Sequence, residues 1–209
     1  MAKNVAVYYG MVSLLDKYIG RILDKLEELG LAEDTLVVFT TDHGHFYGHH
    51  GLRAKGAFHY DDLIRVPFIA RHPGRMPAGT RCDDLQSLVD LAPTFLRTAE
   101  IPIPRGMVGV DQTDAWRGQA PPPRDHVIVE NRHEPTTIHM KTYVDKRYKI
   151  TVYYRQPYGE IFDLQEDPEE RVNLWDKLEC AELKADLVMR LLQAEMGKEP
   201  LRVPRTAGA

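Results

Sequence analysis

The residues best suited to chemistry are concentrated in one stretch of the chain, Thr41–Gly56. Asp42 is followed directly by His43, three more histidines follow within the stretch, and Lys55 lies near its end. Carboxylate oxygens and imidazole nitrogens bind divalent cations, and a lysine ammonium acts as a point charge against an anion. The residue types favour a metal or catalytic site. The alternative is a solvated loop with hydrogen-bonded histidines and a surface lysine.

An apolar run, Leu36–Thr40, precedes the Asp-His pair and predicts a strand. The run lacks alternation, so we expect both of its faces to be covered, as in a parallel sheet between helices. Asp42 and His43 would then follow the carboxyl end of a strand, the edge at which α/β sheets bind ligands. The sequence from Thr41 to Asp62 has no sustained period, which predicts a long loop of the kind that usually serves function.

Other periodic segments supply the frame around this loop. An apolar stripe at steps of three and four predicts a long helix before the strand, with Gly30 as its left-handed end. The members of the stripe are Tyr8, Met11, Leu15, Tyr18, Ile22, Leu26 and Leu29. Val66–Ala70 predicts a second strand, and Ser87–Ala99 predicts a helix that Pro93 either kinks or restarts.

The pattern changes after a segment rich in proline and glycine, Ile101–Arg124. Three strands and a closing helix follow, with a hairpin turn at Asp145–Arg147. We expect the strands at Val127–Val129, Thr137–Val144 and Tyr148–Tyr154, and the helix at Leu178–Met196, with Leu183, Leu187, Leu191 and Ala194 on its apolar face. The sequence therefore predicts an α/β unit over residues 1–124 and a small α+β unit over residues 125–209.

Composition narrows the function classes. The formal net charge is -4, with 43% hydrophobic and 28% charged residues, which is ordinary for a globular protein and disfavours a nucleic-acid partner. No apolar run reaches membrane-spanning length. Cys82 and Cys180 are far apart, and we expect two reduced thiols. The first ten residues lack the features of a signal peptide, so the chain as written predicts a cytoplasmic location.

Further motifs follow one another in a fixed order along most of the chain. They comprise Phe39–Gly44, Gly48–Leu52, Lys55–Gly56, Arg65–Ile69, His72–Gly74, Leu88–Thr94, Gly159–Leu164, Asp167–Glu170 and Asn173–Leu174. This order, from about Tyr8 to Trp175, resembles the C-terminal portion of the type I sulfatases in the alkaline-phosphatase-like superfamily. The resemblance implies a partial sandwich with a sheet between helices, followed by a small antiparallel sheet with a C-terminal helix.

The resemblance also implies roles for individual residues. Asp42 and His43 match a pair that holds a divalent metal, Ca²⁺ above all, and His rather than Asn at position 43 leaves Mn²⁺ or Zn²⁺ open. Lys55 matches the lysine that contacts the sulfate group and acts in catalysis. His50 matches a recurrent histidine, for which we expect a catalytic or substrate contact. His59 and His133 could line the substrate pocket, and a structural role is the alternative.

The nucleophile of the family that this sequence resembles is a formylglycine made in a Cys-x-Pro/Ala-x-Arg motif. Neither Cys82 nor Cys180 has these neighbours, and we expect this motif and an early aspartate pair upstream of Met1. The chain by itself is therefore expected to be inactive, to bind metal weakly, and to expose apolar surface and a sheet edge through which it could form a homo-oligomer.

Three functions follow as hypotheses. The first is hydrolysis of sulfate esters, with a carbohydrate ester as one substrate class. The second is a phosphodiesterase or phosphonate hydrolase of the same superfamily. The third is a non-catalytic remnant or binding module.

Overall fold

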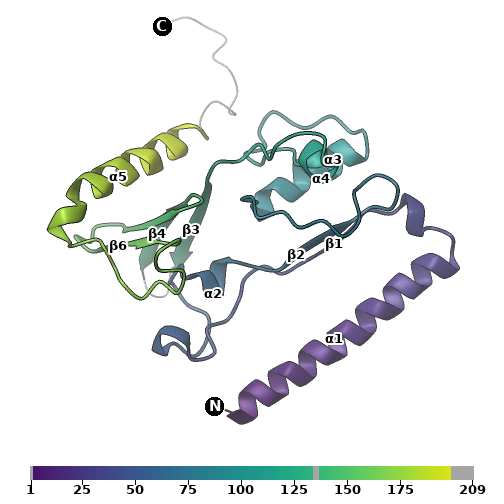
Figure 1. Cartoon of the computed structure of the whole chain (residues 1–209), viewed down its shortest axis with the longest axis horizontal. Helices are drawn as coiled ribbons and strands as arrows, with labels where there is room; N and C mark the ends of the chain where they lie inside the picture. The colour runs from purple at the N-terminus through teal and green to yellow at the C-terminus, as the bar shows by residue number, and fades with distance from the viewer. Residues whose placement is uncertain (1, 134–136, 199–209) are drawn as a thin grey trace, which may run out of the picture.

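The structure is a computed structural model that describes residues 2–133 and 137–198 (Figure 1). Its elements are two separate sheets with the helices arranged around them. In chain order they are α1 (Ala2–Glu28), η1 (Ala32–Asp34), β1 (Val37–Thr40), η2 (His49–Gly51), α2 (Asp61–Ile64), β2 (Phe68–Arg71), η3 (Leu88–Asp90), α3 (Leu91–Thr98), α4 (Thr113–Trp116), β3 (Val127–His133), β4 (Ile138–Val144), β5 (Tyr148–Tyr153), β6 (Gly159–Asp163), η5 (Leu178–Cys180) and α5 (Ala181–Met196).

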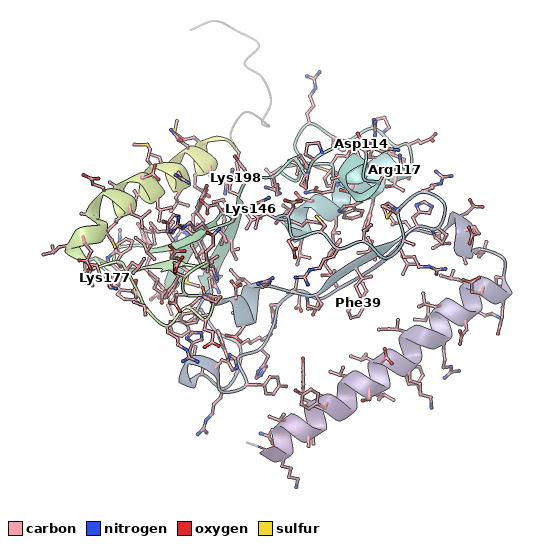
Figure 2. The ribbon with its side chains drawn as sticks, in the orientation of Figure 1. Phe39, Asp114, Arg117, Lys146, Lys177 and Lys198 are labelled. Atoms are coloured by element: carbon pink, nitrogen blue, oxygen red, sulfur yellow. The ribbon has the colours of Figure 1, made fainter. Side chains whose placement is uncertain are left out.

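Helix α1 confirms the predicted long helix. Gly30 has a φ of 66° and donates its N–H to Glu27, while the next N–H bonds Leu26, so the helix ends in a left-handed turn. Most of the helix lies apart from the rest of the chain (Figures 1 and 2). It is joined to the rest by the Tyr8–Tyr47 ring contact, with centroids 4.5 Å apart, and by the Glu27–Arg71 ion pair at 3.1 Å. Its large apolar side chains, including Leu15 and Ile22, are exposed, as the sequence led us to expect.

The expectation of a parallel sheet around β1 was wrong for the described residues. Strand β1 pairs with β2 in an antiparallel ribbon in which Val37 faces Arg71 and Thr40 faces Phe68. A parallel partner needs a crossover connection, usually a helix, and the chain between β1 and β2 carries only the short turns η2 and α2. Nor are both faces covered here, because Phe39 is 40% exposed and Ile69 is 62% exposed.

The second sheet is an antiparallel meander in the order β3-β4-β5-β6. Helix α5 packs on one face of it, and together they form the main core. The core residues are Tyr143, Ile150, Ile161, Trp175, Leu187 and Leu191. Strand β6 is absent from the strands predicted above. Its first residue is Gly159, where a side chain would not fit, because a Cβ atom would come within 2.4 Å of the Trp175 ring.

The connection between the two sheets is held by a buried carboxylate. Asp90 accepts hydrogen bonds from Arg124 Nε and Nη2 at 2.6 and 2.5 Å and from the N–H of Val110 at 2.9 Å. Burial acts to raise the pKa of Asp90, but the bonds from Arg124 and Val110 outweigh it and hold the pKa below its ordinary value. Ser87 and Asp90 form a capping box, and Pro93 lies in the first turn of α3, so it restarts the helix.

Lys146, in the β4–β5 turn, also bridges the two parts of the chain through its contact with Asp84 at 2.5 Å (Figure 2). Both cysteines are free, as expected. No helix among the described residues is both long and apolar enough to cross a lipid bilayer. The proposed boundary between residues 124 and 125 stays a prediction.

Candidate active site

Asp42 lies two residues beyond the end of β1 and presents its carboxylate to solvent. Its Oδ1 accepts the N–H of His43 at 2.9 Å and the hydroxyl of Thr41 at 3.2 Å. The backbone hydrogen bond from His43, supported by Thr41, lowers the pKa of Asp42 below its ordinary value. The side chain is 81% exposed, so an ionised carboxylate remains open to a ligand.

The ring of His43 is oriented by its own loop. Nδ1 lies 2.9 Å from the carbonyl oxygen of Gly44, and only a protonated Nδ1 can donate to a carbonyl. The Nε2 atom then carries the lone pair, which is the tautomer that a metal ligand requires. Nε2 lies 3.5 Å from Asp42 Oδ2, a separation at which two donors can bind one cation.

Lys55 reaches the same place from the other end of the loop. Its Nζ lies 3.3 Å from Nε2 of His43. The structure therefore brings together Asp42, His43 and Lys55, the three residues to which the sequence assigned metal and anion chemistry. Their individual roles stay predictions.

The donor set at this place is partial. Among residues 2–133 and 137–198, no group of three or more His, Cys, Asp or Glu side chains could hold a metal ion. Asp42 and His43 supply two donors with suitable chemistry, and Ca²⁺ takes six to eight oxygen ligands. The described residues thus fit a divalent cation as half of a site.

His50 belongs to a second cluster in the same loop. Its side chain is 17% exposed, its Nε2 lies 3.6 Å from Asp62 Oδ2, and Asp62 Oδ1 lies 2.9 Å from Nδ1 of His49. The ring of Tyr60 stacks on His50 with centroids 3.8 Å apart and an angle of 7° between the planes. Within the described residues, no hydrogen bond or ring contact joins His50 to Lys55.

Gly44 joins the two halves of the loop. Its N–H donates to Leu63 O at 2.8 Å, and a Cβ atom at this position would lie 1.9 Å from Asp62 O. The absence of a side chain at Gly44 admits the backbone of the α2 segment. The close approach brings Gly44 against the Tyr60–Leu63 segment, whose Tyr60 and Asp62 contact His49 and His50.

The two predicted pocket histidines lie elsewhere. His59 is buried, and its Nδ1 lies 2.7 Å from Thr142 Oγ1 on β4. Burial, with a contribution from the charge of Lys149, lowers the pKa of His59 to about 4. These contacts support the structural alternative for His59. His133 ends β3, and its side chain lies outside the described part of the structure.

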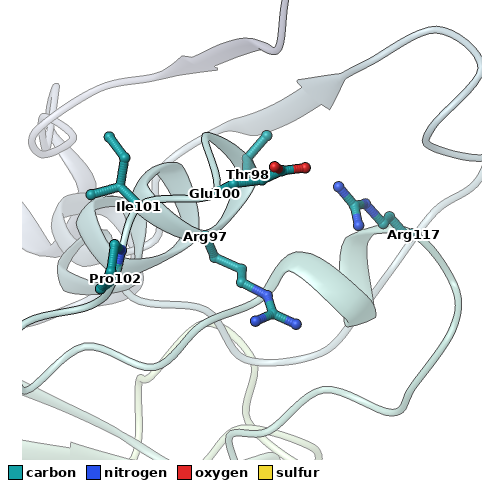
Figure 3. Close-up of a pocket in the computed structure, with 6 residues that line it drawn as sticks. All are labelled: Arg97, Thr98, Glu100, Ile101, Pro102 and Arg117. Atoms are coloured by element: carbon teal, nitrogen blue, oxygen red, sulfur yellow. The ribbon is translucent and has the colours of Figure 1, made fainter.

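A hollow of about 500 Å³ lies between α3 and α4, and it contains none of the predicted site residues (Figure 3). It is lined by Arg97, Thr98, Glu100, Ile101, Pro102 and Arg117. Arg97 lies in the last turn of α3 and Arg117 directly follows α4, where basic side chains complement the helix dipole. The arginines therefore have a structural explanation.

Comparison with known proteins identifies the family. The family model described as N-sulphoglucosamine sulphohydrolase, C-terminal, matches residues 48–197, which include His50 and Lys55. The chain belongs to the sulfatase family. The match confirms the resemblance that the motifs indicated.

Curated sulfatases align with nearly the whole chain. It is 31% identical over 193 residues to an N-acetylglucosamine-6-O-sulfatase of Bacteroides thetaiotaomicron, covering 89% of this chain and 34% of the relative. It is 32% identical over 198 residues to an arylsulfatase of Clostridium perfringens, covering 93% of this chain and 40% of the relative. This sulfatase chain thus spans between a third and two fifths of the length of these relatives.

Solved structures confirm the fold. A structure of a protein in complex with its substrate D-glucosamine-2-N,6-O-disulfate matches with a TM-score of 0.82 and 27% identity, covering 92% of this chain and 41% of that one. A phosphonate monoester hydrolase of Agrobacterium radiobacter matches with a TM-score of 0.83 and 26% identity, over 92% of this chain and 41% of that one. The mixed α/β architecture, with two antiparallel sheets, is that of the sulfatase C-terminal region.

Two residues beside the histidines of this chain were not identified from the sequence. Asp62 and Tyr60 were seen only as the end of a long loop, yet they hold His49 and His50. The local signal was the run His59–Asp62, in which an imidazole, a phenol and two carboxylates are adjacent. The partners of His59, Tyr60 and Asp61 in the C-terminal part of the chain could not be inferred, because Thr142, Glu160 and Glu170 lie 83 to 109 positions away.

Proposed function

We propose that this chain contributes the Asp42–His43 metal pair and the sulfate-binding Lys55 to a site that hydrolyses sulfate esters. The observation that carries the proposal is the approach of Lys55 Nζ to within 3.3 Å of His43 Nε2, which itself lies 3.5 Å from Asp42 Oδ2. A cation donor pair and a positive side chain thus adjoin one another, as an anionic ester bound to a metal would require. Membership of the sulfatase family supports the sulfate ester as the anion.

Asp42 and His43 are the residues that would hold the metal, with Ca²⁺ as the first candidate and Mn²⁺ or Zn²⁺ as alternatives. When bound, such an ion would polarise the oxygens of the ester and offset their charge. With two protein donors the ion would keep most of its waters. We therefore propose that the chain by itself binds the metal weakly.

Lys55 would act on the anion directly. Its ammonium is exposed at the loop and free to rotate from His43 towards a bound sulfate group. A positive charge beside the sulfate group stabilises the negative charge that develops on the sulfuryl and leaving oxygens. For the substrate we propose a sulfated sugar, because the relatives and neighbours include an N-acetylglucosamine-6-O-sulfatase and a complex with a disulfated glucosamine.

A phosphonate monoester is the second candidate substrate. The Agrobacterium radiobacter phosphonate monoester hydrolase matches this chain with a TM-score of 0.83, as well as the sulfated-glucosamine complex does. Both esters present tetrahedral anionic groups, and the described half-site has no feature that separates them. Sulfate is preferred because the family model and the curated relatives are sulfatases.

The test compares turnover of an aryl sulfate and an aryl phosphonate in the presence of Ca²⁺. For the chain alone we expect no turnover, since its sequence contains no Cys-x-Pro/Ala-x-Arg motif. Metal-dependent turnover that Lys55→Ala abolishes would refute that part of the proposal. Lys177→Ala is the matched control, because Lys177 is an exposed lysine just before η5 (Figure 2).

A hybrid enzyme tests the substrate class. In it, this chain replaces the matching segment of the Clostridium perfringens arylsulfatase. We expect aryl sulfate to be the faster substrate, and Lys55→Ala to remove activity that Lys177→Ala retains. Faster turnover of the phosphonate would establish the second candidate instead.

A further inference from the structure

The turn that carries His49 and His50 needs external support. Gly48 and Gly51 have φ angles of 107° and 73°, and His50 itself has a φ of 52°, which a residue with a side chain rarely adopts. η2 is a single short turn closed by its own backbone bonds, such as that from Gly51 N–H to Gly48 O at 3.1 Å. The His50 side chain is contacted by Asp62 and by the stacked ring of Tyr60.

Tyr60 and its neighbours are anchored in turn by the four-stranded sheet. The Tyr60 hydroxyl donates to Oε1 of Glu160 on β6 at 3.3 Å. The His59 ring bonds Thr142 on β4 at 2.7 Å. The N–H of Asp61 donates to Oε2 of Glu170 at 2.6 Å. Each of these consecutive residues therefore has its own fixed point in the C-terminal unit.

Lys149 on β5 closes this set of contacts. Its Nζ lies 2.5 Å from Asp61 Oδ1, 2.6 Å from Glu170 Oε1 and 3.1 Å from the carbonyl oxygen of His59. Lys149 and Glu170 are both buried. A buried ion pair favours the backbone arrangement that keeps its charges together, because separating them leaves a buried charge uncompensated.

We propose that Tyr60 and Asp62 are positioning residues that transmit the geometry of the four-stranded sheet to His50. Tyr60 contacts the sheet through its hydroxyl and His50 through its ring, so one side chain spans both ends of the link. Asp62 adds the charge that orients both histidines. The inference rests on the proposed function to the extent that His50 serves the site, while the link itself can be tested without turnover.

The test uses NMR of the 209-residue chain with labelled histidines. An aromatic ring stacked on His50 shifts the His50 ring protons, so Tyr60→Leu should remove that shift. Tyr60→Phe keeps the ring but loses the bond to Glu160, and it should move the same signals part of the way. Asp62→Asn should shift the ring signals of both His49 and His50.

Tyr153→Phe is the matched control. Tyr153 donates to the other oxygen of the same carboxylate, Glu160 Oε2, at 3.0 Å, and it makes no ring contact with His50. It should leave the histidine signals unchanged. If Tyr60→Leu unfolds the chain, Tyr60→Phe and Asp62→Asn carry the test. Native-like amide spectra with unshifted His50 signals in both of these variants would overturn the proposal, whereas missing sulfatase turnover would bear on the proposed function alone.

Discussion

The ammonium nitrogen of Lys55 lies 3.3 Å from Nε2 of His43, although twelve positions of a loop separate the two residues. His43 Nε2 can accept this contact with its lone pair, because the ring proton is on Nδ1 and is donated to the carbonyl oxygen of Gly44. A cation bound to His43 would therefore displace the ammonium, which could then turn to an anion bound beside the metal. The proposed metal and anion functions of the loop would thus be linked through one nitrogen atom.

Removal of the Asp42 carboxylate should weaken metal binding. We expect Asp42→Ala to reduce the affinity for Ca²⁺ by about tenfold or more, because it removes a charged donor of a site that has only two protein donors. Isothermal titration calorimetry measures this directly. Asp114→Ala, an exposed aspartate at the start of α4, should bind Ca²⁺ as the unaltered chain does. Equal affinities in the two variants would contradict the assignment of Asp42.

Gly44→Ala should destabilise the loop. The added Cβ atom would lie 1.9 Å from the carbonyl oxygen of Asp62, so the backbone must move. We expect a loss of about 2 kcal/mol or more in the free energy of unfolding, measured by urea denaturation. Gly10→Ala in α1 has no atom within 4 Å of the new Cβ and should instead stabilise by about 0.5–1 kcal/mol. A neutral Gly44→Ala variant would show that the two halves of the loop do not meet as described.

The stability of the fold should fall in acid because of His59. Its folded pKa of about 4 lies below the ordinary value of 6.5, so the unfolded chain binds a proton that the folded chain excludes. The stability contribution is full above about pH 6.5 and is lost as the pH falls towards about 4, with about 3 kcal/mol as its upper limit. His59→Gln should flatten the urea-measured dependence in this window. An unchanged slope would show that another group dominates.

Lys149→Met should be among the most damaging single substitutions. It leaves the carboxylates of Asp61 and Glu170 together without their shared cation, and Glu170 is buried. Breaking a buried pair in this way costs about 3–5 kcal/mol. Burial already raises the pKa of Glu170 against the opposing effect of Lys149. The double variant Lys149→Met/Glu170→Gln should recover part of the loss, and a double variant less stable than Lys149→Met would argue against this explanation.

Elements with a strong period could be predicted from the sequence. The stripe of α1 and the buried face of α5 were evident because apolar residues recur at helical spacing. The run of β1 indicated a strand but not its direction, which depends on the connection to β2. The sequence did not reveal strand β6, which begins at Gly159. Glycine is required there because the ring of Trp175, sixteen positions further along the chain, leaves no space for a Cβ atom.

The candidate site divides in the same way. Asp42, His43 and Lys55 lie in one loop, and their chemistry and proximity followed from adjacent sequence. The support of His50 did not, because Tyr60 bonds Glu160 across one hundred positions and Asp61 bonds Glu170 across 109. Local sequence specifies which side chains are present, while only the packing of the two sheets determines which distant partners hold them.

Paramagnetic mapping with Mn²⁺ tests the central claim most directly. The ion can replace Ca²⁺ at a site of oxygen and imidazole donors, and it broadens NMR signals of the atoms around it. The account predicts that Mn²⁺ first broadens the signals of Asp42, the His43 ring and the Lys55 side chain, and that excess Ca²⁺ restores them. Broadening centred on other carboxylates, with the His43 and Lys55 signals unaffected, would contradict it.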